Sequence, residues 1–169
     1  DNLIAEKKAV PMIVVMPFGH AVPFGSPKDI QAKNIEVYEK YIFEDVMPHI
    51  HAKYRVEKSK AKTAIAGLSM GGGQSLAIGM NHLDTFSAIG AFSAAVPADI
   101  NTRFEALKKA TPLIWFACGK DDFIYSRSVE LHDKLQAAGV KHTWRSTDGA
   151  HTYTNWRQYL AEFAPLLFH

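Results

Sequence analysis

The fold of this chain is decided by the stretch Thr63-Ala64-Ile65-Ala66-Gly67-Leu68-Ser69-Met70-Gly71-Gly72-Gly73. Its apolar first half predicts a buried strand, and its glycine-rich second half, followed by apolar residues, predicts the start of a helix. Gly67, Ser69 and Gly71 fit the G-x-S-x-G nucleophile elbow, a sharp strand-to-helix turn that exposes a serine hydroxyl. The motif alone also occurs in ordinary turns, so the flanking strand and helix are the context that it needs. We expect side chains at Gly67 and Gly71 to collide across this turn.

The composition predicts one ordinary globular domain over residues 1–169. The chain has 169 residues, of which 47% are hydrophobic and 21% charged, with a net charge of +2. This small, dispersed charge gives no reason to expect a nucleic acid or a membrane surface as partner. No run of 18 apolar residues exists to cross a bilayer. The single Cys118 cannot form an internal disulfide and is expected to be buried.

Short apolar segments alternate with helical patterns along the chain. A strand buried on both faces is expected at residues 11–16, followed by a proline-rich loop at residues 17–29. The later strands and helices follow the same alternation, which predicts an α/β fold with a mainly parallel sheet. After the elbow strand, the expected strands are residues 87–92, 113–117 and 142–146, and the expected helices are residues 35–54, 70–82, 103–108, 127–138 and 153–167.

Partners for Ser69 are expected beyond the carboxyl ends of the strands, where functional loops of such sheets lie. A serine hydroxyl needs an imidazole to take its proton, and the imidazole needs a carboxylate to orient it. Asp121 and Asp122 follow the fourth expected strand, and His151 follows the fifth. The order Ser69, Asp122, His151 is that of an α/β-hydrolase, although the adjacent Asp121 could take the place of Asp122.

Five segments also match a known family pattern that covers nearly the whole chain: 13–17 (IVVMP), 43–50 (FEDVMPHI) with Tyr54, 66–72 (AGLSMGG), 118–122 (CGKDD) and 149–151 (GAH) followed by Trp156. In these segments the chain resembles the esterases of carbohydrate esterase family 1, which have the α/β-hydrolase fold. That family includes feruloyl, acetylxylan and esterase D-like enzymes. The resemblance implies Ser69 as nucleophile, His151 as general base and Asp122 as the orienting acid, with Asp121 as the fallback.

The chain departs from this family pattern at its amino-terminal end. The family places further strands and a His-Gly loop before the strand expected at residues 11–16, and that loop supplies one of two oxyanion donors. Here only the amide of Met70 can be assigned as a donor, and loss of one donor costs about a hundred- to a thousandfold in rate. We therefore expect the chain to be the carboxyl-terminal two thirds of a full domain, with its first strands supplied by another segment or chain.

The resemblance implies a carboxylic ester substrate, with feruloyl or acetyl groups on plant cell-wall polysaccharide as leading candidates, and a secreted or cell-surface location. Aromatic and histidine side chains expected at the mouth of the site are Phe18, His20, Phe24, Tyr125, Tyr153 and Trp156, each of which could instead pack under a loop. Alternatives with the same triad are an S-formylglutathione hydrolase, a siderophore esterase and an acyltransferase. A non-catalytic fragment or carbohydrate-binding piece would show a Ser69 and a His151 that fail to meet.

No cofactor or metal is expected from the sequence. His49 and His51 lie two residues apart on a helical pattern and so do not share a face, which makes a zinc pair improbable. The other histidines outside the triad have no partner cluster and are expected at the surface. Cys118 has no obvious histidine partner, so it is not expected to act as a nucleophile.

Overall fold

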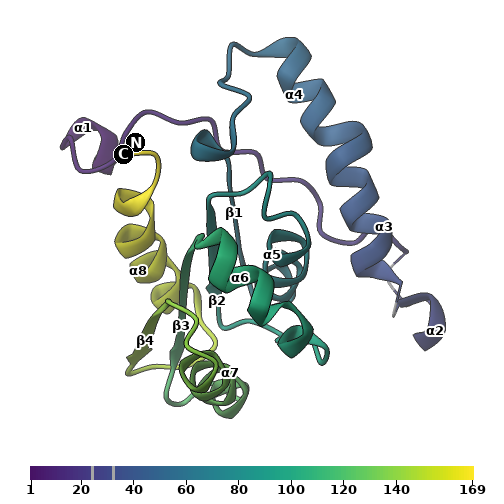
Figure 1. Ribbon diagram of the computed structural model, residues 1–169, viewed down its shortest axis with the longest axis vertical. Coiled ribbons are helices and arrows are strands. Elements are labelled where there is room, and N and C mark those ends of the chain that lie inside the picture. The colour runs from purple at the N-terminus through teal and green to yellow at the C-terminus, as the bar shows by residue number, and fades with distance from the viewer. Residues whose placement is uncertain (24, 32) are drawn as a thin grey trace. The chain divides into compact units, whose positions relative to one another are not determined.

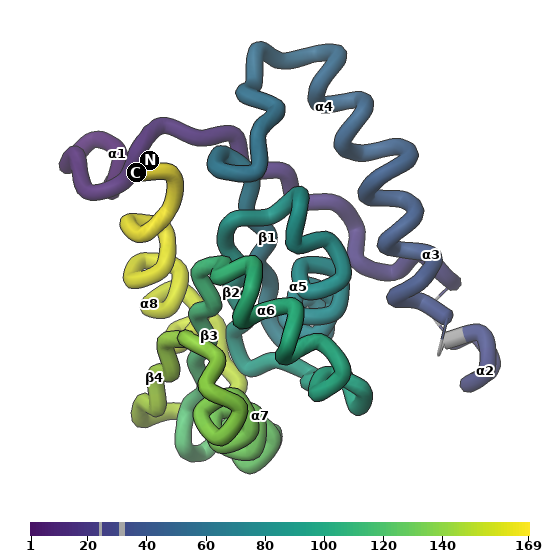
Figure 2. The backbone as a smooth tube through the Cα atoms, in the orientation of Figure 1, coloured from purple at the N-terminus to yellow at the C-terminus, as the bar shows by residue number. Residues whose placement is uncertain are grey.

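The computed structural model describes residues 1–23, 25–31 and 33–169 (Figures 1 and 2). The chain divides into two units: Asp1–Pro11 with Ser59–His169, and Met12–Lys58. Each unit is described by itself below. The expectation that residues 1–169 form one domain therefore stays a prediction.

The first unit is built on one parallel sheet. Among the described residues its order is β1-β2-β3-β4, with β1 (Ala64–Leu68), β2 (Ala88–Phe92), β3 (Leu113–Gly119) and β4 (Thr143–Thr147). Each pair is parallel, so the carboxyl ends of all four strands meet at one edge of the sheet. The expected elbow strand and the three expected strands after it are thus confirmed.

Helices join the strands, because parallel neighbours need a crossover connection. The helices of this unit are α1 (Asn2–Ala5), α5 (Met70–Asn81), α6 (Phe104–Ala110), α7 (Tyr125–Ala137) and α8 (Tyr153–Phe163), with 3-10 turns at Lys60–Lys62, Ile100–Arg103 and Ala164–Leu166. Gly139 follows the end of α7 with a φ of 70°, the left-handed conformation that ends many helices.

The sheet has helices on both faces, which gives three layers (Figure 1). Successive residues of a strand point to opposite faces, so Ile89 and Gly90 of β2 mark the two sides. A Cβ atom at Gly79 of α5 would lie 2.7 Å from Cγ1 of Ile89, so α5 packs on that side. A Cβ atom at Gly90 would lie 2.8 Å from Cε1 of Phe163, so α8 packs on the other side.

Each face carries its own hydrophobic core. On the α5 side, Leu76, Ile89 and Ile114 pack with residues of α6 and α7, Leu107 and Leu131 among them. On the α8 side the core is aromatic: Phe92, Trp115, Tyr159 and Phe163 contact one another with ring centroids 5.5 to 6.1 Å apart. Burial of these side chains fixes the sheet between the two helix layers.

The second unit contains a long helical segment and an extended segment. Its helical parts are α2 (Lys28–Gln31), α3 (Asn34–Tyr41), a π-helical stretch (Ile42–Val46) and α4 (Met47–Lys53), the last three continuous with one another. Pro48 has no N–H to donate to the carbonyl of Glu44, and the π-helical stretch lies at that point. The predicted helix at residues 35–54 is confirmed, with a π-helical stretch at Ile42–Val46 within it.

The strand expected at residues 11–16 is wrong in this structure. The segment has no regular structure, and it exposes 69% of Val14 and 88% of Met16. Strand geometry requires a hydrogen-bonded neighbour, and no strand among the described residues pairs with this segment. Among the described residues, no helix has the length and apolar character that crossing a bilayer requires.

Candidate active site

Ser69 lies at the turn between β1 and α5 in a strained backbone conformation. Its φ of 52° and ψ of −119° are rarely adopted by residues with a side chain, at a cost of about 1 to 3 kcal/mol. Hydrogen bonds hold the turn: the Ser69 N–H donates to the Phe92 carbonyl over 2.8 Å, and the Ser69 carbonyl accepts from Gly73 and Ala95 over 3.1 Å each. This geometry is that of the predicted elbow.

The glycines of the elbow have unequal steric roles. A Cβ atom at Gly67 would lie 2.3 Å from the Gly71 carbonyl oxygen, so no side chain fits there. A Cβ atom at Gly71 would meet nothing within 4 Å, so the expected collision at Gly71 is wrong. Gly73 allows a close approach to the loop after β2, because its Cβ would lie 2.2 Å from the Ala95 carbonyl oxygen.

Ser69, His151 and Asp122 form one hydrogen-bonded line. The distance between Ser69 Oγ and His151 Nε2 is 3.0 Å, and His151 Nδ1 lies 3.0 and 2.9 Å from the two carboxylate oxygens of Asp122. A carboxylate only accepts, so Nδ1 carries the hydrogen and Nε2 is free to accept the serine hydroxyl. Asp121 instead is exposed and donates its backbone N–H to Gly149, so Asp122 is the carboxylate that faces His151.

The Asp122 carboxylate is fully buried, yet it is held in its charged form. Burial alone would raise its pKa. Hydrogen bonds from the Ser93 hydroxyl, the Ile124 N–H and His151 outweigh this effect, so the pKa of Asp122 lies below its ordinary value. A charged carboxylate is what a protonated imidazole needs beside it.

The loops that carry Asp122 and His151 are held close together. A Cβ atom at Gly119 would lie 2.1 Å from the Gly149 carbonyl oxygen, so the backbones of the two segments approach too closely there for a side chain. The side chain of Asn155 donates to the Asp148 carbonyl over 2.8 Å, which ties the histidine loop to the first turn of α8. These contacts fix the position of His151 relative to Asp122.

Ser93 and Trp156 contact members of the triad and support them. Ser93 was not among the residues singled out from the sequence. Ser93 follows β2 as Ser69 follows β1, and it is fully buried. The indole N–H of Trp156 donates to Ser93 Oγ over 3.0 Å, which leaves the Ser93 hydrogen for the Asp122 carboxylate. The Trp156 ring also meets the His151 ring edge to face at 4.8 Å.

Comparisons with known proteins show the family to which the chain belongs. The model of the esterase family, described as "Putative esterase", matches residues 1–167. The chain belongs to this esterase family. A curated relative, the endo-1,4-beta-xylanase/feruloyl esterase of Xylanibacter ruminicola, is 33% identical over 175 residues, which cover 99% of this chain. The chain spans only 23% of the length of that relative.

Two solved esterases share the fold. A ferulic acid esterase matches with a TM-score of 0.77 at 27% identity, covering 98% of this chain and 73% of its own. A second match is the ferulic acid esterase of carbohydrate esterase family 1 from Anaeromyces mucronatus, solved with ferulic acid. It has a TM-score of 0.82 at 23% identity, and the match covers 99% of this chain and 69% of that one. The predicted α/β-hydrolase fold and the predicted family resemblance are confirmed.

The oxyanion donor expected of this chain is the amide of Met70. Met70 is the first residue of α5, and the first N–H groups of a helix have no carbonyl partner within the helix. The positive end of the helix dipole adds to the favourable potential for a negative oxygen at this point. The assignment of this donor remains a prediction.

The predicted substrate-contacting residues lie in different surroundings. Trp156 is only 8% exposed and packs on His151, so we propose a supporting role for it instead of substrate contact. Tyr125 begins α7, and its hydroxyl hydrogen-bonds Ser146 over 2.7 Å while its ring packs against Trp144. Its contact with a substrate stays a prediction.

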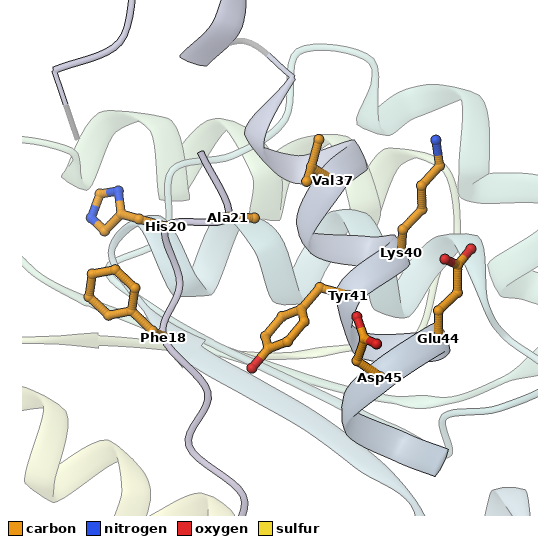
Figure 3. A pocket seen from close by; sticks show the side chains of 8 residues that line it. All are labelled: Phe18, His20, Ala21, Val37, Lys40, Tyr41, Glu44 and Asp45. Carbon is orange, nitrogen blue, oxygen red and sulfur yellow. The ribbon is translucent and has the colours of Figure 1, made fainter. Parts of the chain in front are cut away.

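Phe18 and His20 belong to the second unit. Their rings lie 5.4 Å apart and line, with Tyr41 and other residues of the helical segment, a pocket of about 480 Å³ (Figure 3). Lys40, Glu44 and Asp45 of the helical segment add one positive and two negative side chains to its lining. The expected place of Phe18 and His20 at the mouth of the esterase site stays a prediction, and Phe24 lies outside the described residues.

The sequence missed one exposed aromatic residue at the triad. Phe123 follows Asp122 directly and is 78% exposed, with its ring centroid 4.6 Å from that of His151. A large apolar residue directly after the candidate acid was the available signal, but only the folded turn brings it to His151. Phe123 is therefore the exposed aromatic neighbour that the triad histidine has in the described part of the chain.

Two of the remaining histidines do have a partner, contrary to expectation. His142 Nδ1 donates to the Val140 carbonyl over 2.7 Å, which leaves its Nε2 to accept from His132 Nδ1 over 2.8 Å. Both side chains are half-buried, and the His142 ring stacks on Phe116. Among the described residues, no group of three or more potential ligands could hold a metal ion.

Proposed function

We propose that this chain hydrolyses carboxylic esters through an acyl intermediate on Ser69. The proposal is carried by one observation, the line from Ser69 Oγ through His151 to the Asp122 carboxylate, with distances of 2.9 to 3.0 Å. This line is what nucleophilic activation of a serine requires. It also speaks against a non-catalytic piece, in which these side chains would not meet.

In the first half of the reaction, Ser69 Oγ attacks the ester carbonyl carbon while His151 Nε2 takes the hydroxyl proton. The Asp122 carboxylate stabilises the imidazolium that forms. The Met70 N–H stabilises the negative oxygen of the tetrahedral intermediate. When the intermediate collapses, the bond to the alcohol oxygen breaks, and His151 gives its proton to that oxygen.

In the second half, water takes the place of the alcohol. His151 removes a proton from the water as it attacks the acyl carbon. The second tetrahedral intermediate then collapses, the bond to Ser69 Oγ breaks, and the serine recovers its proton from His151. The acid product leaves, and the triad returns to its starting protonation state.

The substrate class that we favour is the feruloyl ester of a cell-wall polysaccharide. The support comes from relatives: a 33% identical protein is named for xylanase and feruloyl esterase activity, and a 27% identical solved chain is a ferulic acid esterase.

We further propose that another segment or chain extends the sheet at β1. Within the described residues, β1 pairs with β2 alone and so has one free edge.

The test is a burst assay with p-nitrophenyl acetate and methyl ferulate, followed by the intact mass of the protein. We expect turnover and a transient acyl adduct, both of which disappear in Ser69→Ala. The exposed Ser126 on α7 gives a matched control, because Ser126→Ala removes a serine hydroxyl that is not part of the line from Ser69 to Asp122. A folded protein with neither burst nor adduct would overturn the proposal, and the ratio of the two rates chooses between acetyl and feruloyl groups.

A further inference from the structure

Phe123 is a large apolar side chain that the fold leaves exposed to solvent. It is 78% exposed although it lies between a buried aspartate and a half-buried isoleucine. Single exposed apolar residues are common on proteins and need no explanation. Phe123 differs from them because its ring lies 4.6 Å from the ring of His151, tilted by 45°.

The turn that carries Phe123 is fixed on both sides. The Asp122 N–H donates to the Gly119 carbonyl over 3.1 Å, and the Tyr125 N–H donates to the Asp122 carbonyl over 2.9 Å. The Ile124 N–H donates to Asp122 Oδ1 over 3.1 Å, so the triad carboxylate itself closes the turn around Phe123. The ring is thus presented to solvent beside His151 by the same contacts that orient the acid.

The position beside His151 indicates which part of an ester would meet Phe123. In acyl transfer through a serine, the histidine donates its proton to the leaving alcohol oxygen, whereas the acyl oxygen points to the oxyanion donor. In this structure His151 Nε2 faces Ser69 Oγ, and the candidate oxyanion donor follows on Met70. A ring packed on the imidazole therefore borders the alcohol side of the ester.

We propose that Phe123 is a substrate-contacting residue that selects the alcohol portion of the ester and favours a sugar ring there. This inference rests on the proposed esterase function of Ser69. The face of an aromatic ring is negative and attracts C–H groups, and the flat C–H face of a sugar can cover it. Binding would take the exposed ring out of water, which a methyl alcohol is too small to do.

The test compares two esters that share one acyl group: methyl ferulate and a feruloylated oligosaccharide. Both give the same feruloyl-Ser69, so deacylation is common to them. We expect Phe123→Ala to lower kcat/KM for the oligosaccharide ester by about 10- to 100-fold and to leave methyl ferulate within about threefold. Phe123→Tyr keeps the aromatic face and should restore the preference, and Leu160→Ala, which truncates a residue 54% exposed on α8, is the matched control.

A binding measurement keeps this inference separate from the proposed function. In a Ser69→Ala background no acyl transfer occurs. Calorimetry with the same two esters should show that Phe123→Ala weakens the binding of the oligosaccharide ester and not that of methyl ferulate. Equal losses on both esters would mean that Phe123 merely positions His151, and no loss on either would mean that it contacts neither; both results overturn the inference. Wild-type protein that forms no acyl-Ser69 would overturn the proposed function, whatever the binding result.

Discussion

Trp156 donates its indole N–H to Ser93 Oγ over 3.0 Å, although the two residues are 63 positions apart in the sequence. Ser93 in turn donates to the Asp122 carboxylate, so a tryptophan of α8 and a serine after β2 together support the acid of the triad. Three further residues of this neighbourhood, Ser69, Asp122 and His151, follow the ends of the other three strands.

Ser93→Ala should destabilise the protein, and by less in acid than near neutral pH. The variant leaves the buried Trp156 N–H without an acceptor, which costs about 1 to 3 kcal/mol of unfolding free energy. The folded pKa of Asp122 lies below its ordinary value of 3.8. The Asp122 charge therefore stabilises the folded protein above pH 3.8, and this stabilisation is lost as the pH falls through the folded pKa. Without the Ser93 bond the folded pKa rises toward the unfolded value, so the variant gains less stability from the Asp122 charge near neutral pH and loses less of it in acid.

Urea unfolding of both proteins between about pH 3 and pH 7 measures this effect. Trp156→Phe is the matched control, because it removes the indole N–H but leaves the bond from Ser93 to Asp122. That variant should lose stability without a change in the acid profile. An acid profile of Ser93→Ala that parallels the wild type would contradict the assignment of the Ser93 hydrogen to Asp122.

Asp122→Asn should abolish most of the esterase activity while the protein stays folded. An amide in this place can donate to His151 and so favours the tautomer that cannot accept the Ser69 proton. The expected fall in kcat is on the order of 10⁴-fold. Asp121→Asn is the neighbouring control, since Asp121 is exposed and meets the histidine loop through its backbone N–H. A larger fall in the Asp121 variant would show that the wrong carboxylate has been assigned.

Gly67→Ala and Gly71→Ala should differ sharply, although both glycines belong to the same motif. The new Cβ at residue 67 would lie 2.3 Å from a backbone oxygen that cannot rotate away, which predicts a loss of about 1 to 3 kcal/mol and a disturbed elbow. The new Cβ at residue 71 meets open space, and alanine favours the helix there. Thermal unfolding and ester hydrolysis of the pair measure the contrast; equal losses would count against this account of the elbow.

Cys118 should be inert in the folded protein. Burial raises the pKa of its thiol to about 11, helped by the nearby Asp122 charge and opposed by hydrogen bonding with Ser128 and Ser93. At pH 8 only about one thiol in a thousand is then ionised. We expect no reaction with a disulfide reagent at pH 8 in native protein, rapid reaction in urea, and unchanged ester hydrolysis after treatment. Activity lost together with native labelling would show an accessible, reactive thiol.

The elbow, the triad and most of the sheet could be predicted because their signals are local. The strand before Ser69, the glycines around it and the order of acid and histidine after later strands can all be read without knowing the fold. The choice between Asp121 and Asp122 could not be made from the residues alone, because it depends on which side chain the turn after β3 directs toward His151.

The features that the sequence missed depend on distant partners. The apolar segment at residues 11–16 looks like a strand, but a strand forms only where a neighbour pairs with it, and no strand in the described part of the chain does so. Ser93 looks like any loop serine until Trp156 and Asp122 meet it. The bond between His132 and His142 likewise needs α7 and the approach to β4 to lie side by side.

Ser69 and His151 are 82 positions apart in the sequence, and only the parallel sheet brings them within 3.0 Å. Contacts of such long sequence separation form late and slowly in folding. On the proposed function, ester hydrolysis by this chain would report on folding: recovery of activity after dilution from denaturant would time the docking of β4 onto the rest of the sheet, a step that helix content alone would not detect.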